Sequence, residues 1–160
     1  MPLSDYPITA IPLPGTLEGS GAAGKPVLGT QAIFSQSVGP SLLVDGTTYK
    51  QALFIAPCDG CYIKELWLSG AVKIAQGTNT IAFEKYDASA NAGANVQSAA
   101  TIDPDTITAK EGLKLSLTTT VADLVMDEGD VLWCTLVAGT QSTAGEGYVV
   151  TGVVIVPTVL

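Results

Sequence analysis

The feature that most constrains this chain is a series of short apolar segments separated by Gly, Asp and Asn turns, from about residue 31 onward. Several segments alternate at the two-residue period of a strand. In the segment 114–118, for example, Leu115 and Leu117 share one face. The expected strands are Gln31–Gln36, Ser41–Val44, Gln51–Ala56, Tyr62–Leu68, Thr80–Tyr86, Thr106–Lys110, Leu113–Thr118, Val131–Val137 and Tyr148–Val156. The segment Val131–Val137 is apolar on both faces, which is typical of a strand deep in a sandwich or between subunits.

Signals for helices are few. The Ala-rich segment 88–100 is interrupted by Asn91, Gly93 and Asn95 and has no apolar face, so we expect a loop there. Residues 120–126 are expected to form at most a short turn of helix. Short strands without a long amphipathic helix predict an all-β fold, an antiparallel β-sandwich or barrel.

The first 30 residues differ from the rest of the chain. Four prolines within residues 1–14 favour an extended, polyproline-like arm over a helix or a central strand. We therefore divide the chain into an arm (1–30) and a sandwich domain (31–160). A disordered tail is the alternative to an arm that becomes ordered on a partner. We favour the arm because its apolar residues exceed what a solvated tail needs. These residues are the predicted contacts with a partner or with further copies of the chain: Tyr6, Ile8, Ile11, Leu13 and Leu17.

Missing residue types exclude several function classes. The chain has no His and no Arg, so it lacks a Ser-His or Cys-His pair, a His metal ligand and a bidentate phosphate fork. A net charge of −8 repels a nucleic-acid backbone. We expect no enzymatic activity, no cofactor and no nucleic-acid partner.

No segment predicts membrane insertion. The prolines near the N-terminus interrupt the place of a signal-peptide apolar region, and the most apolar stretch, 148–160, is too short and too broken to span a bilayer. Three cysteines are too few for a disulfide framework, which favours synthesis in a reducing cytoplasm.

Two motifs allow more than one interpretation. Cys58-Asp-Gly-Cys61 is formally a C-x-x-C, but Pro57 precedes it and a strand follows, so we favour a structural turn; a local disulfide and a metal or redox site are the alternatives. The acidic groups 103–105 and 127–130 are interpreted as solvated turn carboxylates, with Ca²⁺ binding and glycosidase chemistry as alternatives.

The remaining residues give no sharper signal. The seven lysines are dispersed singly and no phosphate-binding loop occurs. We assign the aromatic residues within the strand patterns to the core, in preference to a sugar-stacking platform: Tyr62, Trp67, Phe83, Tyr86 and Trp133.

Residues 50–157 resemble the β-sandwich head decoration, or cement, proteins of tailed bacteriophages. The segments that carry the resemblance are Ile55–Pro57, the strand 63–68, the turn and strand Gly77–Phe83, the turn Glu128–Leu132 and the final strand from Tyr148. The resemblance implies a small jelly-roll-like domain, commonly trimeric, on the outer capsid surface. It also implies binding to the major capsid protein, bridging of neighbouring capsomers and stabilisation of the head, with an extended N-terminal arm and no catalytic residue.

The sequence thus predicts a structural virion protein made in the host bacterial cytoplasm. The alternative function is a carbohydrate- or receptor-binding β-sandwich domain of a virion fibre or spike, which depends on Trp67 and Trp133 being exposed.

Overall fold

The computed structural model describes residues 29–40, 43–72, 79–87, 89–90, 92–140 and 144–157; at residue 105 it describes the backbone only. The predicted N-terminal arm, apart from Gly29 and Thr30, lies outside these residues. The elements in chain order are β1 (Gly29–Ser37), β2 (Thr47–Ile55), β3 (Cys61–Ser69), β4 (Thr80–Asp87), β5 (Ala92–Asn95), the 3-10 turn η1 (Pro104–Thr106), β6 (Leu113–Lys114), the 3-10 turn η2 (Val121–Asp123), β7 (Val125–Met126), β8 (Val131–Ala138) and β9 (Val149–Pro157).

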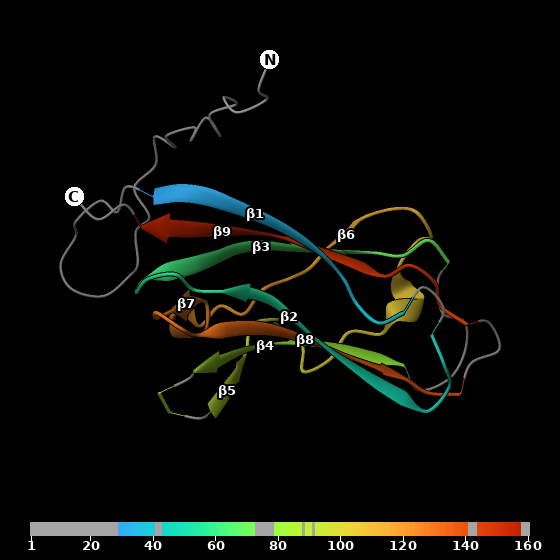
Figure 1. The fold of residues 1–160 in the computed structure, drawn as a ribbon. Helices are drawn as coiled ribbons and strands as arrows, with labels where there is room; N and C mark the ends of the chain where they lie inside the picture. The colour runs from blue at the N-terminus through green and yellow to red at the C-terminus, as the bar shows by residue number, and fades with distance from the viewer. Residues whose placement is uncertain are drawn as a thin grey trace, which may run out of the picture.

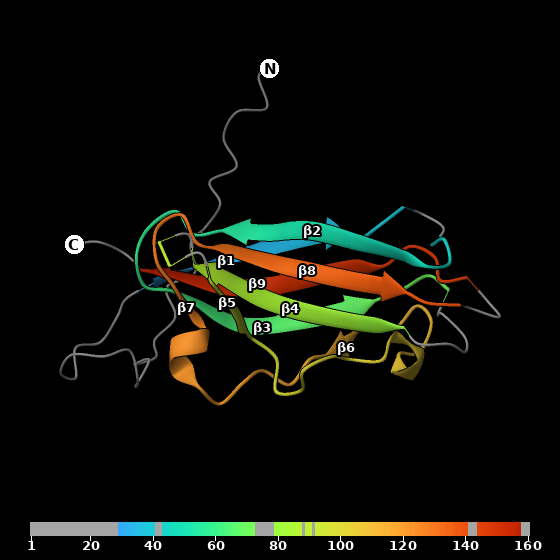
Figure 2. The ribbon, with the colours of Figure 1, turned by 90° about the horizontal axis from the view of Figure 1, so that it is seen from below.

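The strands form two antiparallel sheets packed face to face (Figure 1). One has the order β1-β9-β3-β6, with β7 also paired to β3, and the other has the order β2-β8-β4-β5. Figure 2, seen from below, shows the second sheet lying across the first. The predicted all-β sandwich is confirmed.

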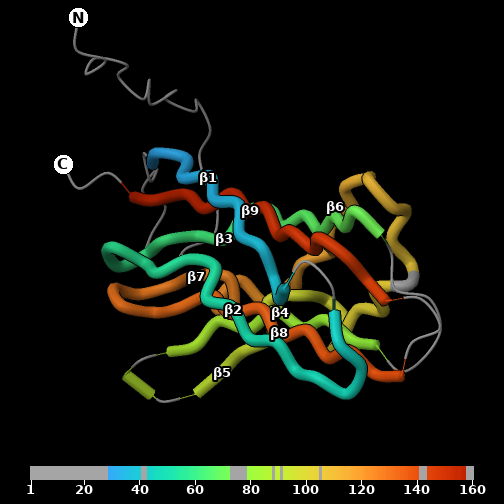
Figure 3. Tube along the Cα trace, turned by 45° about the vertical axis from the view of Figure 1, so that its right-hand side comes forward, coloured from blue at the N-terminus to red at the C-terminus, as the bar shows by residue number. Residues whose placement is uncertain are grey.

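The chain crosses repeatedly between the sheets. The strands β1, β3 and β9 lie in one sheet, while β2, β4 and β8 lie in the other, and in each sheet a late strand is inserted between two early ones. This order is that of a jelly roll in which the short strands β6 and β7 share one position. The tube in Figure 3 shows β1 and β9, the first and last strands, running side by side.

Alternation along the strands produces the core. In β8, every second side chain is buried, and β3 and β4 turn Leu66 and Phe83 toward the same interior. Burying these faces removes apolar surface from water, which is the main stabilising contribution to a fold of this kind. The fully buried core residues of these three strands include Ile63, Leu66, Leu68, Ile81, Phe83, Leu132 and Leu136.

Several predicted strands need correction. Residues 106–110 are not a strand: Thr106 donates backbone and side-chain hydrogen bonds to the Asp103 carbonyl in η1, and Lys110 has a left-handed φ of 67°. The prediction for 113–118 was too long, because only Leu113–Lys114 pairs as a strand with β3. Leu117 then bridges to Gln97, so the chain changes partners within this segment.

Two further segments also differ from expectation. The predicted loop 88–100 contains the strand β5, which pairs with the end of β4. Within the predicted strand 41–44, Leu43 and Val44 are not in a strand, and residues 41–42 lie outside the described part. The expected turn of helix in 120–126 is present as η2, followed by β7.

Candidate functional site

The C-x-x-C motif forms a tight turn into β3. Gly60 has a φ of 78°, a left-handed conformation that favours glycine, and it brings the two Sγ atoms of Cys58 and Cys61 to 3.9 Å. The buried Cys61 thiol donates to the Cys58 carbonyl at 3.2 Å. Burial raises the pKa of Cys61 to about 11, so this thiol is protonated at neutral pH. The structural turn predicted from the sequence is confirmed, and both cysteines are free thiols here.

The acidic turn before β8 satisfies backbone donors. Asp130 is buried, and its carboxylate accepts a hydrogen bond from the Asp127 amide at 3.0 Å. Asp59 accepts one from the Glu128 amide at 2.8 Å, which connects this turn to the cysteine turn. Among the described residues, no group of three or more His, Cys, Asp or Glu side chains is placed to hold a metal ion.

The prediction that both tryptophans belong to the core is wrong. Trp67 is 36% exposed and Trp133 is half-buried, whereas Phe83 is fully buried as expected. The reason is the strand alternation: neighbours such as Leu66 and Leu132 point inward, so the tryptophans point outward. Trp67 and Trp133 therefore lie on the outer faces of opposite sheets.

Trp67 belongs to a small intramolecular cluster on β3 and β6. Its indole Nε1 donates to Glu65 Oε2 at 3.3 Å, while Lys114 Nζ contacts Glu65 Oε1 at 2.8 Å and lies 5.4 Å from the Trp67 ring centroid. The hydrogen bond from Lys114, followed by that from Trp67, lowers the pKa of Glu65 below its usual value. The polar end of this indole is thus already used within the protein.

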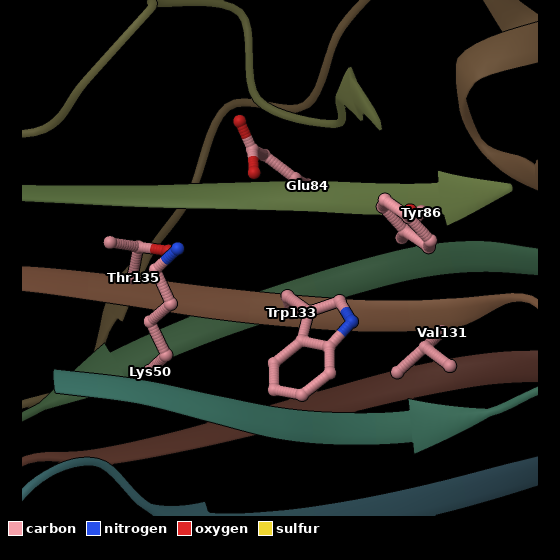
Figure 4. A pocket seen from close by; sticks show the side chains of 6 residues that line it. All are labelled: Lys50, Glu84, Tyr86, Val131, Trp133 and Thr135. Atoms are coloured by element: carbon pink, nitrogen blue, oxygen red, sulfur yellow. The ribbon is translucent and has the colours of Figure 1, made fainter. Parts of the chain in front are cut away.

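Trp133 instead forms the floor of a pocket of about 500 Å³ on the outer face of the second sheet. Figure 4 shows Trp133 between Thr135 with Lys50 at one end and Tyr86 with Val131 at the other, and Glu84 beside it on β4. Strand register explains this grouping. The lining residues come from β2, β4 and β8, and they are Lys50, Glu84, Tyr86, Val131, Trp133 and Thr135.

Short neighbours leave room for the pocket. Trp133 stands opposite Ala52 on β2, and Thr135 stands opposite Ala82 on β4. Methyl side chains beside an indole produce a hollow on a surface that would otherwise be filled by longer residues. The sequence pattern does not group Lys50, Glu84 and Thr135 as a site, although each occupies an outward position at the two-residue period of its strand.

A second surface is formed by β1 and β9. These adjacent nine-residue strands contain no charged residue, and their register is uninterrupted from Gly29 to Ser37. Ile33, opposite Val153, is 70% exposed on the outer face. We call the outward side chains of β1 and β9 the β1–β9 face. The predicted contact residues Tyr6, Ile8, Ile11, Leu13 and Leu17 lie outside the described residues.

No family model matches the chain, and no curated protein matches it. A solved structure with some similarity is a chain of the cyanophage Pam1 capsid asymmetric unit, with 15% identity, a TM-score of 0.49 and coverage of 91% of this chain and 100% of that chain. No helix among the described residues is long and apolar enough to cross a membrane.

Proposed function

We propose that this protein is a non-enzymatic virion protein that binds the outer surface of a phage capsid as an oligomer, most simply a trimer. In this function it bridges neighbouring capsomers and stabilises the head. Its partners are the major capsid protein and further copies of itself. The support consists of the resemblance in residues 50–157, the jelly-roll order of the strands and the chemistry of the β1–β9 face.

The β1–β9 face is the observation that carries the proposal. A chain with a net charge of −8 has two adjacent strands of nine residues each that lack any charge. The centres of protein interfaces are depleted in charged residues, so this face has the composition of a contact surface.

The position of β1 at the end of its sheet adds to this argument. Within the described residues β1 pairs with β9 alone, and it has none of the lysines, prolines or bulges that protect an edge strand. The edge strand β2 of the other sheet differs from β1, because it carries Lys50 and a register shift between Ala52 and Phe54. The β1 edge is therefore the one suited to pairing with a partner chain.

The test is a charge placed on the β1–β9 face. We expect Ile33→Lys to lower occupancy on expanded capsids by about tenfold or more, because a lysine would be desolvated in the contact. The matched control is Val121→Lys: Val121 is 40% exposed in η2, next to β7, which pairs with β3 on the side away from β9. This control is expected to bind within about twofold of wild type.

Oligomeric state is measured in parallel by light scattering. A wild-type protein that is strictly monomeric and does not bind expanded capsids contradicts the proposal. Equal losses of capsid occupancy for Ile33→Lys and Val121→Lys contradict the assignment of the β1–β9 face.

A further inference from the structure

We propose that the pocket around Trp133 binds a neutral saccharide, with one sugar ring stacked on the indole. The site lies on the outer face of the β2-β8-β4-β5 sheet, formed by residues of β2, β4 and β8. This binding activity is separate from capsid attachment, which we place on the β1–β9 face of the other sheet.

The two tryptophans differ in their contacts within the protein. The Trp67 indole is occupied by Glu65 and Lys114, whereas the Trp133 side chain has no intramolecular hydrogen bond in the described part of the chain. An indole has a large apolar ring and one polar N–H, so it contacts ligands that combine apolar and polar surface. A sugar ring has such a surface, with a C–H face flanked by hydroxyls.

The polar groups around the Trp133 indole include both donors and acceptors. Lys50 provides only donors, the Glu84 carboxylate provides only acceptors and the Thr135 hydroxyl provides both. Lys50 and Glu84 are both exposed, and neither takes part in an ion pair among the residues that the structure describes. Sugar hydroxyls donate and accept at the same time, so they complement this mixture better than an amine or a carboxylate does.

The charges of the pocket and of the whole protein favour a neutral ligand. The opposite charges of Lys50 and Glu84 cancel within the pocket, while the protein as a whole carries −8. An acidic ligand would meet the Glu84 carboxylate and the repulsive field of the whole molecule. A neutral ligand is repelled by neither and can still donate hydrogen bonds to Glu84, which favours neutral over acidic saccharides.

The volume of the pocket suits a small saccharide. A volume of about 500 Å³ lies within the range of about 300–1,000 Å³ typical of small-molecule sites. This space accommodates one or two sugar rings and remains open to solvent, so a longer glycan can extend out of it. Many copies on one particle would convert weak binding at each site into avidity for a glycan-covered surface.

The experiment is a glycan array probed with the full-length protein, followed by titration calorimetry with the best neutral oligosaccharide. We expect binding to neutral glycans, with Trp133→Ala weakening the affinity by about tenfold or more. The matched control is Trp67→Ala on the opposite sheet, which is expected to change the affinity by less than about twofold. Capsid occupancy of Trp133→Ala is expected to equal that of wild type.

Glu84→Gln provides a test that does not depend on the indole. Glu84 is exposed, so the variant keeps the thermal stability of wild type, while loss of a charge-assisted hydrogen bond lowers the affinity by about fivefold. Three results would overturn the proposal: no neutral glycan bound by wild type, preference for acidic glycans, or equal losses for Trp133→Ala and Trp67→Ala. Normal glycan binding by a protein that fails to bind capsids would refute only the capsid function.

Discussion

At the scale of single residues, Gly152 shows how closely the sheets are packed. It lies in β9 between Phe34 of β1 and Leu66 of β3, and a Cβ atom built on it would overlap the Phe34 ring and lie 2.9 Å from Leu66 Cδ2. The Phe34 ring also stacks on Phe54 of β2, with ring centroids 5.9 Å apart, and so joins the two sheets. The absent side chain at position 152 therefore makes room for a contact between the sheets.

Gly152→Ala is expected to lower the free energy of unfolding by about 2–3 kcal/mol, because the Phe34 ring and the Leu66 side chain would have to shift to admit the Cβ atom. Urea denaturation measures the change. Gly112→Ala is the control, since its Cβ would meet Trp67 Cε3 at an ordinary 3.5 Å, and a change below about 0.5 kcal/mol is expected. Equal destabilisation by both variants would show that packing against Phe34 is not the cause.

The buried thiols predict a dependence of stability on alkaline pH. Burial raises the pKa of Cys134 to about 12 from 9.0. Between pH 9 and pH 12 the Cys134 thiol loses its proton in the unfolded chain but keeps it in the folded protein. The free energy of unfolding therefore falls as pH rises, by about 1 kcal/mol per pH unit. The contribution of the protonated Cys134 thiol to stability is fully present below pH 9.

Cys134→Val removes this titration and keeps a small apolar side chain in the core. Urea denaturation at a series of pH values between 8 and 10.5 is expected to give a shallower decline for the variant than for wild type. An identical decline in both proteins would show that the burial of Cys134 is not the cause of the pH dependence.

Tryptophan orientation is a residue-scale property that the sequence did not reveal. The segment 131–137 is apolar at every position but one, so its pattern is the same whichever face is buried. In the structure Leu132, Cys134 and Leu136 are buried, so the Trp133 side chain points outward. A sequence-based assignment of apolar residues to the core fails where a strand carries apolar side chains on both faces.

At the scale of elements, Gln97 replaces a missing piece of strand. The strand β5 ends at Asn95, and the buried Gln97 side chain then accepts from the Phe83 amide at 3.1 Å and donates to the Ile81 carbonyl at 3.4 Å and to the Ala100 carbonyl at 3.0 Å. Its side-chain oxygen thus satisfies the Phe83 amide of β4, which β5 does not reach.

Gln97→Leu is expected to destabilise the protein by about 2 kcal/mol, because the Phe83 amide would lose its partner inside the sandwich. Asn95→Ala is the matched control: its bonds to the Ala99 and Ala100 carbonyls are 3.3 Å long and exposed, so a loss below about 0.5 kcal/mol is expected. Thermal and urea denaturation provide the comparison. Similar losses of stability in the two variants would show that Gln97 has no special role.

The elements also show how far local pattern predicts a strand. Long strands with clear alternation, such as β3 and β8, were predicted nearly to their ends. The strand β5 was missed because its sequence, Ala-Gly-Ala-Asn, has low strand propensity and is in a strand only through its pairing with β4. The pocket was missed for a related reason, since its residues meet only when the register of three strands is known.

At the scale of the whole molecule, the jelly roll begins at Gly29, so residues 1–28 can be removed without cutting a described strand. We expect the truncated protein to melt within about 2 °C of wild type and to occupy fewer capsid sites. Calorimetry and co-sedimentation with capsids measure the two effects. A length-preserving control replaces Tyr6, Ile8, Ile11, Leu13 and Leu17 with serine. Unchanged capsid occupancy in both variants would show that the arm has no role in attachment.

The placement of one tryptophan on each outer face has a spectroscopic consequence. Trp67→Phe and Trp133→Phe would each leave a single fluorophore, which reports on the solvent access of one sheet only. A protein held on a shell turns one side toward the shell and the other toward the medium, so iodide would quench the two single-tryptophan proteins unequally on the particle. The difference gives the orientation of the domain on the capsid without an image of the particle. A glycan-binding face directed outward requires Trp133 to be the more strongly quenched.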